Sequence, residues 1–176
     1  AGVLLALVYP WMKSHHLGDI NILVSFALLP ALGTFFVAVG SYDPQSLLMI
    51  LPIGLITVAI LHANNTRDVK TDLQAGLGTI TTSVSLMNAK AIYTFEIFAP
   101  YALALLYVVL LGQPWTLLAV VLTLPLALRN VRTMIQAEDD LPYRGIQRLD
   151  QTTAQLQMAF GLLYALGFFL GSWLGV

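Results

Sequence analysis

Residues 46–72 read SLLMILPIGLITVAILHANNTRDVKTD, and this stretch decides the class of fold. Positions 46–63 contain no Asp, Glu, Lys or Arg, whereas positions 64–72 hold two asparagines and four charged residues. About 20 helical residues cross a hydrocarbon core that is about 30 Å thick. The stretch therefore predicts a membrane-spanning helix that ends in a dense polar segment at the membrane surface.

The whole chain has the composition of a membrane protein. Hydrophobic residues make up 58% of its 176 residues, charged residues only 10%, and the mean hydropathy is +0.81. A soluble domain contains about 25% charged residues. We therefore expect an integral, multi-pass membrane protein that uses the lipid bilayer as its solvent.

The spacing of the charges predicts an all-α transmembrane helix bundle, with residues 1–176 forming part of one domain. A half-span at 1–12 comes first, and its 12 residues are too few to cross the bilayer. Because the chain starts without methionine inside this run, we expect it to be the C-terminal part of a longer protein. Five full spans are expected at 20–40, 46–63, 91–111, 115–132 and 153–175.

Charge and cysteine content exclude several classes of function. The net charge of −1 leaves no basic surplus to neutralise phosphates, so we expect no nucleic-acid partner. The chain contains no cysteine, which excludes disulfides, zinc thiolates and thiol nucleophiles.

The basic residues predict the orientation in the membrane. With five spans, every Lys and Arg falls on alternate connections and hence on one side, which the positive-inside rule makes cytoplasmic. We therefore expect a protein of the cell inner membrane with the polar segment 64–72 on the cytoplasmic side. The basic residues are Lys13, Arg67, Lys70, Lys90, Arg129, Arg132, Arg144 and Arg148.

The polar segment has the residues of a metal–diphosphate site. Asn64, Asp68 and Asp72 are spaced i, i+4, i+8, so they share one face if the helix continues past His62. Carboxylate and carboxamide oxygens are ligands that suit Mg²⁺. Basic side chains such as Arg67 bind diphosphate oxygens. Ordinary helix-end and loop charges are the alternative, and the spacing alone leaves both interpretations open.

The string NNTRDVKTD at 64–72, followed by Ala75-Gly76 and Thr79-Ile80, resembles the second aspartate-rich motif of the UbiA superfamily of intramembrane aromatic prenyltransferases. Within that superfamily it is most similar to the branch that contains the 1,4-dihydroxy-2-naphthoate prenyltransferases of menaquinone synthesis and their animal relative that makes vitamin K2. The resemblance extends over essentially the whole chain, through Leu17-Gly18-Asp19, Leu61-His62-Ala63, residues 151–156 and residues 161–164.

The resemblance implies a nine-helix bundle, of which this chain would be helix four, in part, to helix nine. It implies a transferase in which Mg²⁺, held between two aspartate-rich motifs, binds the diphosphate of a polyprenyl donor while an aromatic acceptor is alkylated. Asp68 and Asp72 would be the metal ligands. Asn64, Asn65 and Arg67 would form the polar shell around metal and diphosphate, and Lys70 would help to bind the diphosphate.

The chain departs from the family pattern in ways that bear on activity and acceptor. The first aspartate-rich motif is absent, so we expect this chain alone to be inactive. Leu77 follows Gly76 where bacterial menaquinone enzymes often carry Gly-Lys-x-Thr. Residues 9–13, YPWMK, look more like the branch that uses 4-hydroxybenzoate. The acceptor therefore stays open between 1,4-dihydroxy-2-naphthoate, 4-hydroxybenzoate and homogentisate.

Other polar residues are weaker candidates. Tyr9, Lys13 and His62 are possible substrate-binding residues, with interfacial anchoring as the alternative for the first two. Glu96 is the only charge well inside a span, and it lies either near the headgroups or in a cavity. The acidic run 138–140 has consecutive carboxylates rather than carboxylates one turn apart, so we interpret it as solvated. His15 and His16 are expected in a plain surface loop.

A membrane transporter is the competing class. Transporters place ionisable groups near the middle of the bilayer, and in this chain only Glu96 comes close to that position. No span carries a ladder of charges. The sequence therefore favours the enzyme.

Overall fold

The computed structural model describes residues 2–138 and 145–176, without the side chains of Lys13 and Ser14. This part of the chain is helical and contains no strand. Its elements are α1 (Gly2–Ser14), α2 (Gly18–Leu23), the π-helical turn η1 (Val24–Leu28), α3 (Leu29–Val39), α4 (Pro44–Arg67), α5 (Val69–Gln74), α6 (Ile80–Ser83), α7 (Leu86–Leu111), the 3₁₀ segment η2 (Trp115–Thr123), α8 (Leu124–Ile135) and α9 (Leu149–Leu174).

Five stretches of this structure are long and apolar enough to cross a membrane, which confirms the five expected spans. They are Gly18–Val39, Pro44–Arg67, Leu86–Leu111, Trp115–Ile135 and Leu149–Leu174. The observed helices are mostly longer than expected at the end that carries charge. Polar residues at a helix end can stay helical because their side chains reach water or each other, so hydropathy alone places the boundary too early.

Two of the spans change their hydrogen-bonding pattern next to a proline. Pro30 follows the π-helical turn η1, and Pro125 follows the 3₁₀ segment η2. Proline has no N–H to donate and its ring collides with the carbonyl four residues earlier. A wider or tighter turn relieves this conflict, so both spans stay continuous through their prolines.

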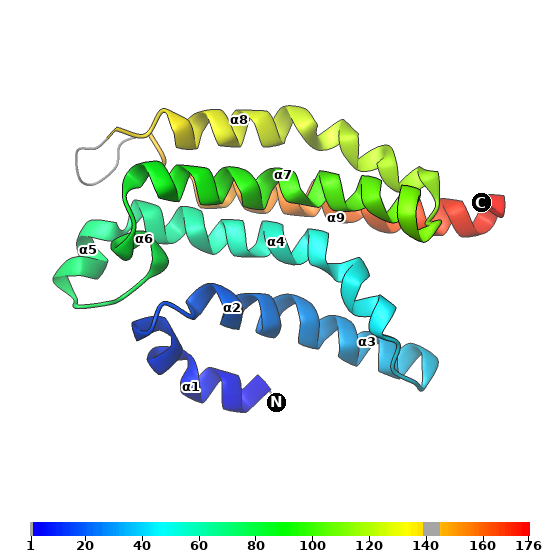
Figure 1. Ribbon diagram of the computed structural model, residues 1–176, viewed down its shortest axis with the longest axis horizontal. Helices are drawn as coiled ribbons and strands as arrows, with labels where there is room; N and C mark the ends of the chain where they lie inside the picture. The colour runs from blue at the N-terminus through cyan, green and yellow to red at the C-terminus, as the bar shows by residue number, and fades with distance from the viewer. Residues whose placement is uncertain (1, 139–144) are drawn as a thin grey trace.

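Helix α4 is the centre of the bundle (Figure 1). It packs against α7 and α9 on one side and against α2, η1 and α3 on the other, while η2 and α8 pack on α7 and α9. Asp43 starts α4 by accepting a hydrogen bond from the backbone N–H of Gln45 at 3.0 Å, and Pro44 occupies the first turn. Because α4 is central, residues near its end can contact α2, α7 and α9.

Helix α9 approaches η2 closely because of a glycine. A Cβ atom at Gly167 would lie 2.9 Å from the Cα atom of Leu117, which real Cβ atoms do not do. The hydroxyl of Thr116 donates a hydrogen bond to the carbonyl of Gly167 at 2.5 Å across the same contact. Glycine and threonine at a membrane helix contact allow this short approach and tie the two backbones together.

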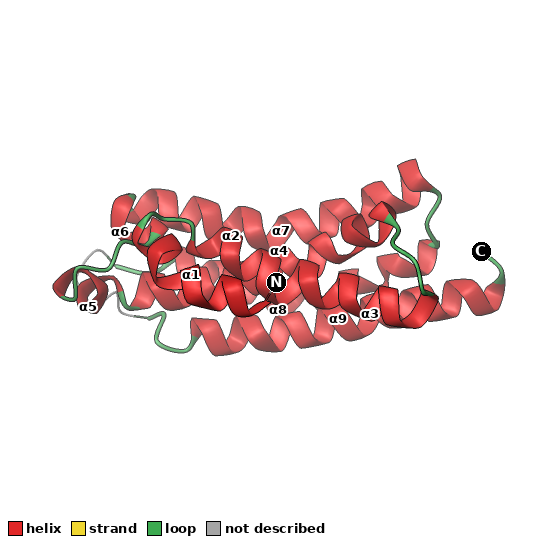
Figure 2. Ribbon diagram, turned by 90° about the horizontal axis from the view of Figure 1, so that it is seen from below, coloured by secondary structure: helices red, strands yellow, loops and turns green. Residues whose placement is uncertain are grey.

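The polar connections meet at one end of the bundle. The end of α1, helices α5 and α6, and the start of α9 lie at the left in Figures 1 and 2, opposite to the C-terminus. Large apolar side chains such as Val109, Phe169 and Trp173 are exposed along the outer faces of the spans. A soluble protein does not expose so much apolar surface, so these faces are expected to contact lipid.

Candidate functional site

The site begins where α4 ends. As the helical spacing required, α4 continues past His62, and it ends at Arg67. Asp68 interrupts the helix, with φ −93° and ψ 7°, before α5 begins. The backbone N–H of Asp68 still donates to Asn64 at 3.0 Å, and that of Asp72 donates to Asp68 at 2.9 Å. The i, i+4 relation therefore survives the interruption.

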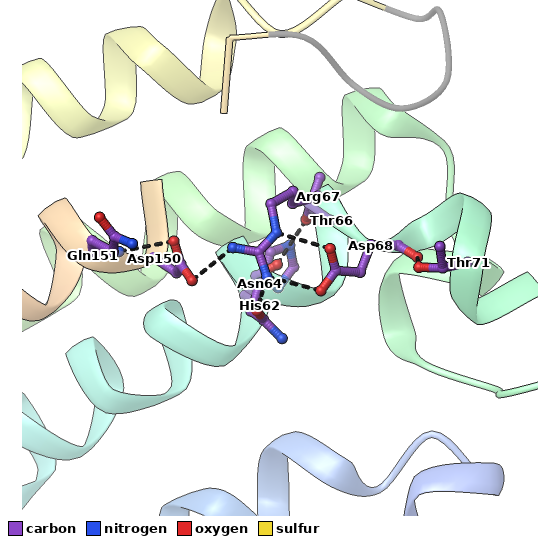
Figure 3. A network of polar contacts seen from close by, with 8 residues as sticks. All are labelled: His62, Asn64, Thr66, Arg67, Asp68, Thr71, Asp150 and Gln151. Carbon is purple, nitrogen blue, oxygen red and sulfur yellow. Dashed lines mark hydrogen bonds and ion pairs between the residues drawn. The ribbon is translucent and has the colours of Figure 1, made fainter. Parts of the chain in front are cut away.

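Arg67 organises the polar segment (Figure 3). Its Nε donates to Asp68 Oδ1 and its Nη2 donates to Asp68 Oδ2, each at 2.8 Å, which makes a bidentate pair. Nη2 also donates to the side-chain oxygen of Asn64, and Nη1 donates to Asp150 Oδ2 at 2.8 Å. Charge-assisted, bidentate pairs of this kind hold a carboxylate in a defined orientation.

Asp150 was not among the predicted site residues. It lies in the first turn of α9, and its Oδ1 accepts a hydrogen bond from the backbone N–H of Gln151 at 2.9 Å. Its ion pair with Arg67 joins the end of α4 to the start of α9 (Figure 3). The only sequence signal was that Asp150 is the last charge before an uncharged span, and that signal does not name a partner.

Most of the N–H groups of Arg67 are already used inside the protein. A guanidinium has five N–H groups, and the four hydrogen bonds above go to Asn64, Asp68 and Asp150. The predicted contact of Arg67 with a diphosphate stays a prediction. What the geometry shows directly is that Arg67 positions Asp68 and Asn64.

An apolar cavity opens beside this network. Asn64 and Asp150 line a cavity of about 300 Å³, and mostly apolar residues from α2, η1 and α4 form the rest of its wall. A second cavity of about 720 Å³ lies between α3, α4 and α9 and shares Phe26 with the first. Two residues of the polar network therefore line one of two largely apolar cavities that meet at Phe26.

The remaining predicted residues are spread over this end of the molecule. Asn65 is buried and lines a separate small cavity together with Tyr9. Asp72 is buried, whereas Lys70 is exposed on α5. The side chain of Lys13 lies outside the described part of the structure. The structure thus brings Asn64, Asp68 and Arg67 into one network and leaves Lys70 at the surface.

His62 faces the interior instead of either large cavity. Its side chain is fully buried, and its Nδ1 lies 3.6 Å from Oε1 of Glu96 on α7. Glu96 is only 5% exposed, so it is enclosed by the bundle and does not lie free at the membrane surface. Asp19 of α2 joins them, since one possible ligand atom from each of the three residues lies within 4.8 Å of the others. The sequence pattern did not predict this cluster.

The surface candidates behave as expected where they are described. Glu138 is exposed, and the other two residues of the acidic run, 139 and 140, lie outside the described residues. His15 and His16 are both exposed, and the backbone of His16 has a positive φ of 61°. The ring of His16 contacts the carbonyl of Thr79 at 3.1 Å, so this loop is tied to the segment before α6.

Fold and site together define a multi-pass membrane helix bundle with an Asp/Arg/Asn network at the mouth of an apolar cavity. The model of the UbiA prenyltransferase family matches residues 1–146. This is most of the chain, and the chain therefore belongs to the UbiA prenyltransferase family.

Proteins named UbiA prenyltransferase domain-containing protein 1 are among its relatives. The protein from Gallus gallus is 33% identical over 158 residues, which cover 88% of this chain and 44% of that protein. The protein from Homo sapiens is 32% identical over 155 residues, covering 88% and 43%. The homologue from Drosophila melanogaster is 34% identical over 154 residues, covering 84% and 39%. The chain spans less than half the length of these curated relatives.

Proposed function

We propose that the protein to which this chain belongs is a Mg²⁺-dependent prenyltransferase. It would transfer a polyprenyl group from a prenyl diphosphate to an aromatic quinone precursor, with its active site on the cytoplasmic side of the membrane. The observation that supports this most strongly is the network of Asn64, Arg67, Asp68 and Asp150 at the mouth of an apolar cavity. Membership of the UbiA prenyltransferase family supports the same reaction class.

The donor atoms at the end of α4 fit Mg²⁺. Asp68 and Asp72 offer carboxylate oxygens, which are hard ligands of the kind that Mg²⁺ prefers. The Asp68 carboxylate is already oriented by Arg67, and its side chain is 37% exposed, so an ion could reach it. A bound Mg²⁺ would neutralise charge on the diphosphate and assist its departure as a leaving group.

The protein's own side chains would position the donor. Arg67 holds Asp68 and Asn64 in place, and Lys70 on the exposed face of α5 supplies a positive charge for the diphosphate. Asn65 is proposed as part of the polar shell, and Tyr9 and Lys13 as further substrate contacts. The predicted substrate contact of His62 stays a prediction, since its ring is buried against Glu96.

The apolar cavities suit the hydrocarbon part of the donor. The polar residues Asn64 and Asp150 stand at one end of the smaller cavity, and the larger one continues from Phe26 between α3, α4 and α9. An isoprenoid chain has no hydrogen-bonding groups, so an apolar groove binds it by excluding water. A diphosphate at Asn64 and a chain along these cavities would use both features at once.

We propose 1,4-dihydroxy-2-naphthoate as the acceptor, in menaquinone biosynthesis, because the residues of 64–72 are most similar to that branch. 4-Hydroxybenzoate and homogentisate are the alternatives, and YPWMK at 9–13 favours the first of them. We also propose that this chain alone is inactive, since it contains only one aspartate-rich motif. A transporter fits less well, because the Arg67 network lies where α4 ends and α9 begins and not along a span.

The direct test is an assay of the natural full-length protein in membranes. One prenyl diphosphate is offered with each of the three acceptors, with Mg²⁺ or with excess chelator, and the prenylated products are identified by mass. We expect a product with 1,4-dihydroxy-2-naphthoate only when Mg²⁺ is present. No product from any acceptor, together with substrate-dependent ion flux in liposomes, would favour the transporter instead.

A further inference from the structure

The buried cluster of Asp19, His62 and Glu96 combines three potential metal ligands from three helices. One ligand atom from each residue lies within 4.8 Å of the other two. His62 is 0% exposed and Glu96 is 5% exposed, and Asp19 is partly buried. No other group of three or more His, Asp or Glu side chains is gathered this tightly among the described residues.

The cluster lacks hydrogen-bond partners. Three buried atoms of the cluster have no hydrogen-bond partner of good geometry within the described part of the chain. They are both ring nitrogens of His62 and the Oε2 atom of Glu96. An unpartnered polar group in the interior costs about 1–3 kcal/mol, and more if it is charged. Buried polar groups in native proteins almost always have a hydrogen-bond partner. These atoms therefore indicate a bound ligand that would complete their contacts.

Charge points to a cation as the guest. Two carboxylates beside a neutral imidazole carry a formal charge of −2, and none of the ion pairs found in the described structure joins a Lys or Arg to Asp19 or Glu96. An uncompensated carboxylate inside a membrane bundle is costly. A single divalent cation would neutralise both carboxylates and use the free ring nitrogen of His62.

We propose that Asp19, His62 and Glu96 bind a divalent transition-metal ion of the Zn²⁺ type, at a site distinct from the Mg²⁺ site of Asp68 and Asp72. Imidazole nitrogen suits zinc and its neighbours in the transition series, whereas Mg²⁺ prefers oxygen alone. Three protein ligands would leave the fourth tetrahedral position for water. The proposal does not depend on the proposed prenyl transfer.

The geometry needs only small adjustments to hold the ion. Ligand atoms at zinc distances of about 2.0–2.2 Å are separated by roughly 3.3–3.6 Å in a tetrahedron. The His62 Nδ1 to Glu96 Oε1 distance of 3.6 Å already matches this separation. The ligand atom of Asp19 lies within 4.8 Å of the other two, so it would have to approach them to complete the site.

The surroundings offer space for a water ligand. A small cavity of about 10 Å³ borders Asp19 and Asn65, which is close to the space that one water molecule needs. A water molecule in this cavity would be next to Asp19, the one proposed ligand that borders it.

The test is the zinc content of the natural full-length protein, purified in detergent and freed of metal with a chelator. One equivalent of Zn²⁺ is added, unbound metal is removed by gel filtration, and bound zinc is measured by mass spectrometry. Affinity follows from competition with a chromophoric chelator. The test variants are His62→Gln and Glu96→Gln, and the matched controls are His16→Gln and Glu138→Gln, which change the same residue types at exposed positions.

We expect about one zinc per chain in the wild type and in both controls. In His62→Gln and Glu96→Gln the affinity should fall by more than the roughly 10–100-fold that loss of an outer-shell partner costs. Glu96→Gln keeps the shape of the side chain, so it tests the site even if His62→Gln fails to fold. If the wild type binds no zinc, or the test variants bind it as well as the controls do, protons neutralise the cluster and the proposal is wrong.

Discussion

Helix α4 carries two neighbouring polar clusters, one around Arg67 and one around His62. They differ in whether their polar atoms find partners within the protein. In the first, Arg67 is paired with Asp68 and Asp150, and both members of the Arg67–Asp68 pair are partly exposed. In the second, His62 and Glu96 are buried and keep atoms without partners. A network that satisfies itself is organised before any ligand arrives. For the second network, we propose that a bound cation supplies the missing partners.

The difference arises from the neighbours of α4. At the Arg67 level, α9 supplies Asp150, which completes a set of one cation and two anions. Around His62, helices α2 and α7 supply Asp19 and Glu96, and none of the ion pairs in the described structure joins a Lys or Arg to them. The role of a polar residue on α4 therefore depends on which charged side chains the neighbouring helices place beside it.

The largest expected effect comes from removing the proposed metal ligands of the first cluster. Asp68→Ala and Asp72→Ala in the full-length protein should each lower the rate of prenyl transfer by about 10²–10³-fold, as loss of a group that stabilises transition-state charge does. The rate is measured in membranes with a labelled prenyl diphosphate. Glu138→Ala, at an exposed position, is the control. Near-normal rates in both test variants at equal protein levels would refute the assignment.

Damage to packing should be separable from damage to either cluster. Gly167→Ala places a Cβ atom 2.9 Å from Leu117 Cα and should lower the free energy of unfolding by about 1–3 kcal/mol. Gly161→Ala, on the same helix, meets its nearest atom, Ile53 Cδ1, only at 4.0 Å and should be neutral or slightly stabilising. Thermal unfolding in detergent distinguishes them. Equal midpoints would mean that α9 and η2 are not in close contact.

The Arg67 network should show a moderate, shared effect. Arg67→Lys keeps the charge but loses the bidentate pair with Asp68, and Asp150→Asn removes the link to α9. Each should lower kcat/KM about tenfold, which corresponds to about 1.4 kcal/mol.

The double variant distinguishes a network from two separate contacts. Because both substitutions act on Arg67, Arg67→Lys/Asp150→Asn should lose clearly less than the product of the single losses. The measurement is kcat/KM for the prenyl diphosphate at saturating acceptor. Strict multiplication of the two losses would mean that Asp150 and Asp68 are held independently.

The smallest expected effect comes from changing Tyr93, which lies beside His62. The hydroxyl of Tyr93 pairs with Thr153 at 2.7 Å, and its ring centroid is 6.3 Å from that of His62. Tyr93→Phe should cost about 1 kcal/mol or less, because Thr153 keeps its bond to the carbonyl of Leu149.

Zinc affinity and prenyl transfer should both stay within about threefold of wild type in Tyr93→Phe, which is less than 1 kcal/mol. Tyr107→Phe is a matched control, since its hydroxyl donates to Leu48 away from both clusters. A loss of zinc in Tyr93→Phe alone would show that the hydroxyl belongs to the metal cluster.

The spans and the polar segment were predictable from sequence, and some local details were not. The uncharged run 46–63 and the string at 64–72 were enough to place α4 and to expect Asn64 and Asp68 on one face. The π-helical turn before Pro30 and the 3₁₀ segment before Pro125 were not expected, although the prolines themselves were visible. A proline shows that a helical hydrogen bond is missing, but not how the backbone compensates for it.

The sequence by itself determines that this is a membrane protein, because the bilayer acts on each residue separately and hydropathy along the chain is sufficient. The sequence does not determine which residues become partners in the site. Asp150 meets Arg67 across 83 residues, and Asp19 and Glu96 meet His62 from two further helices. Such pairings depend on how each helix is rotated and which helices are neighbours, and only packing decides both. The packing of the bundle therefore decides that Arg67 finds partners within the protein and that His62 and Glu96 keep buried atoms without hydrogen-bond partners.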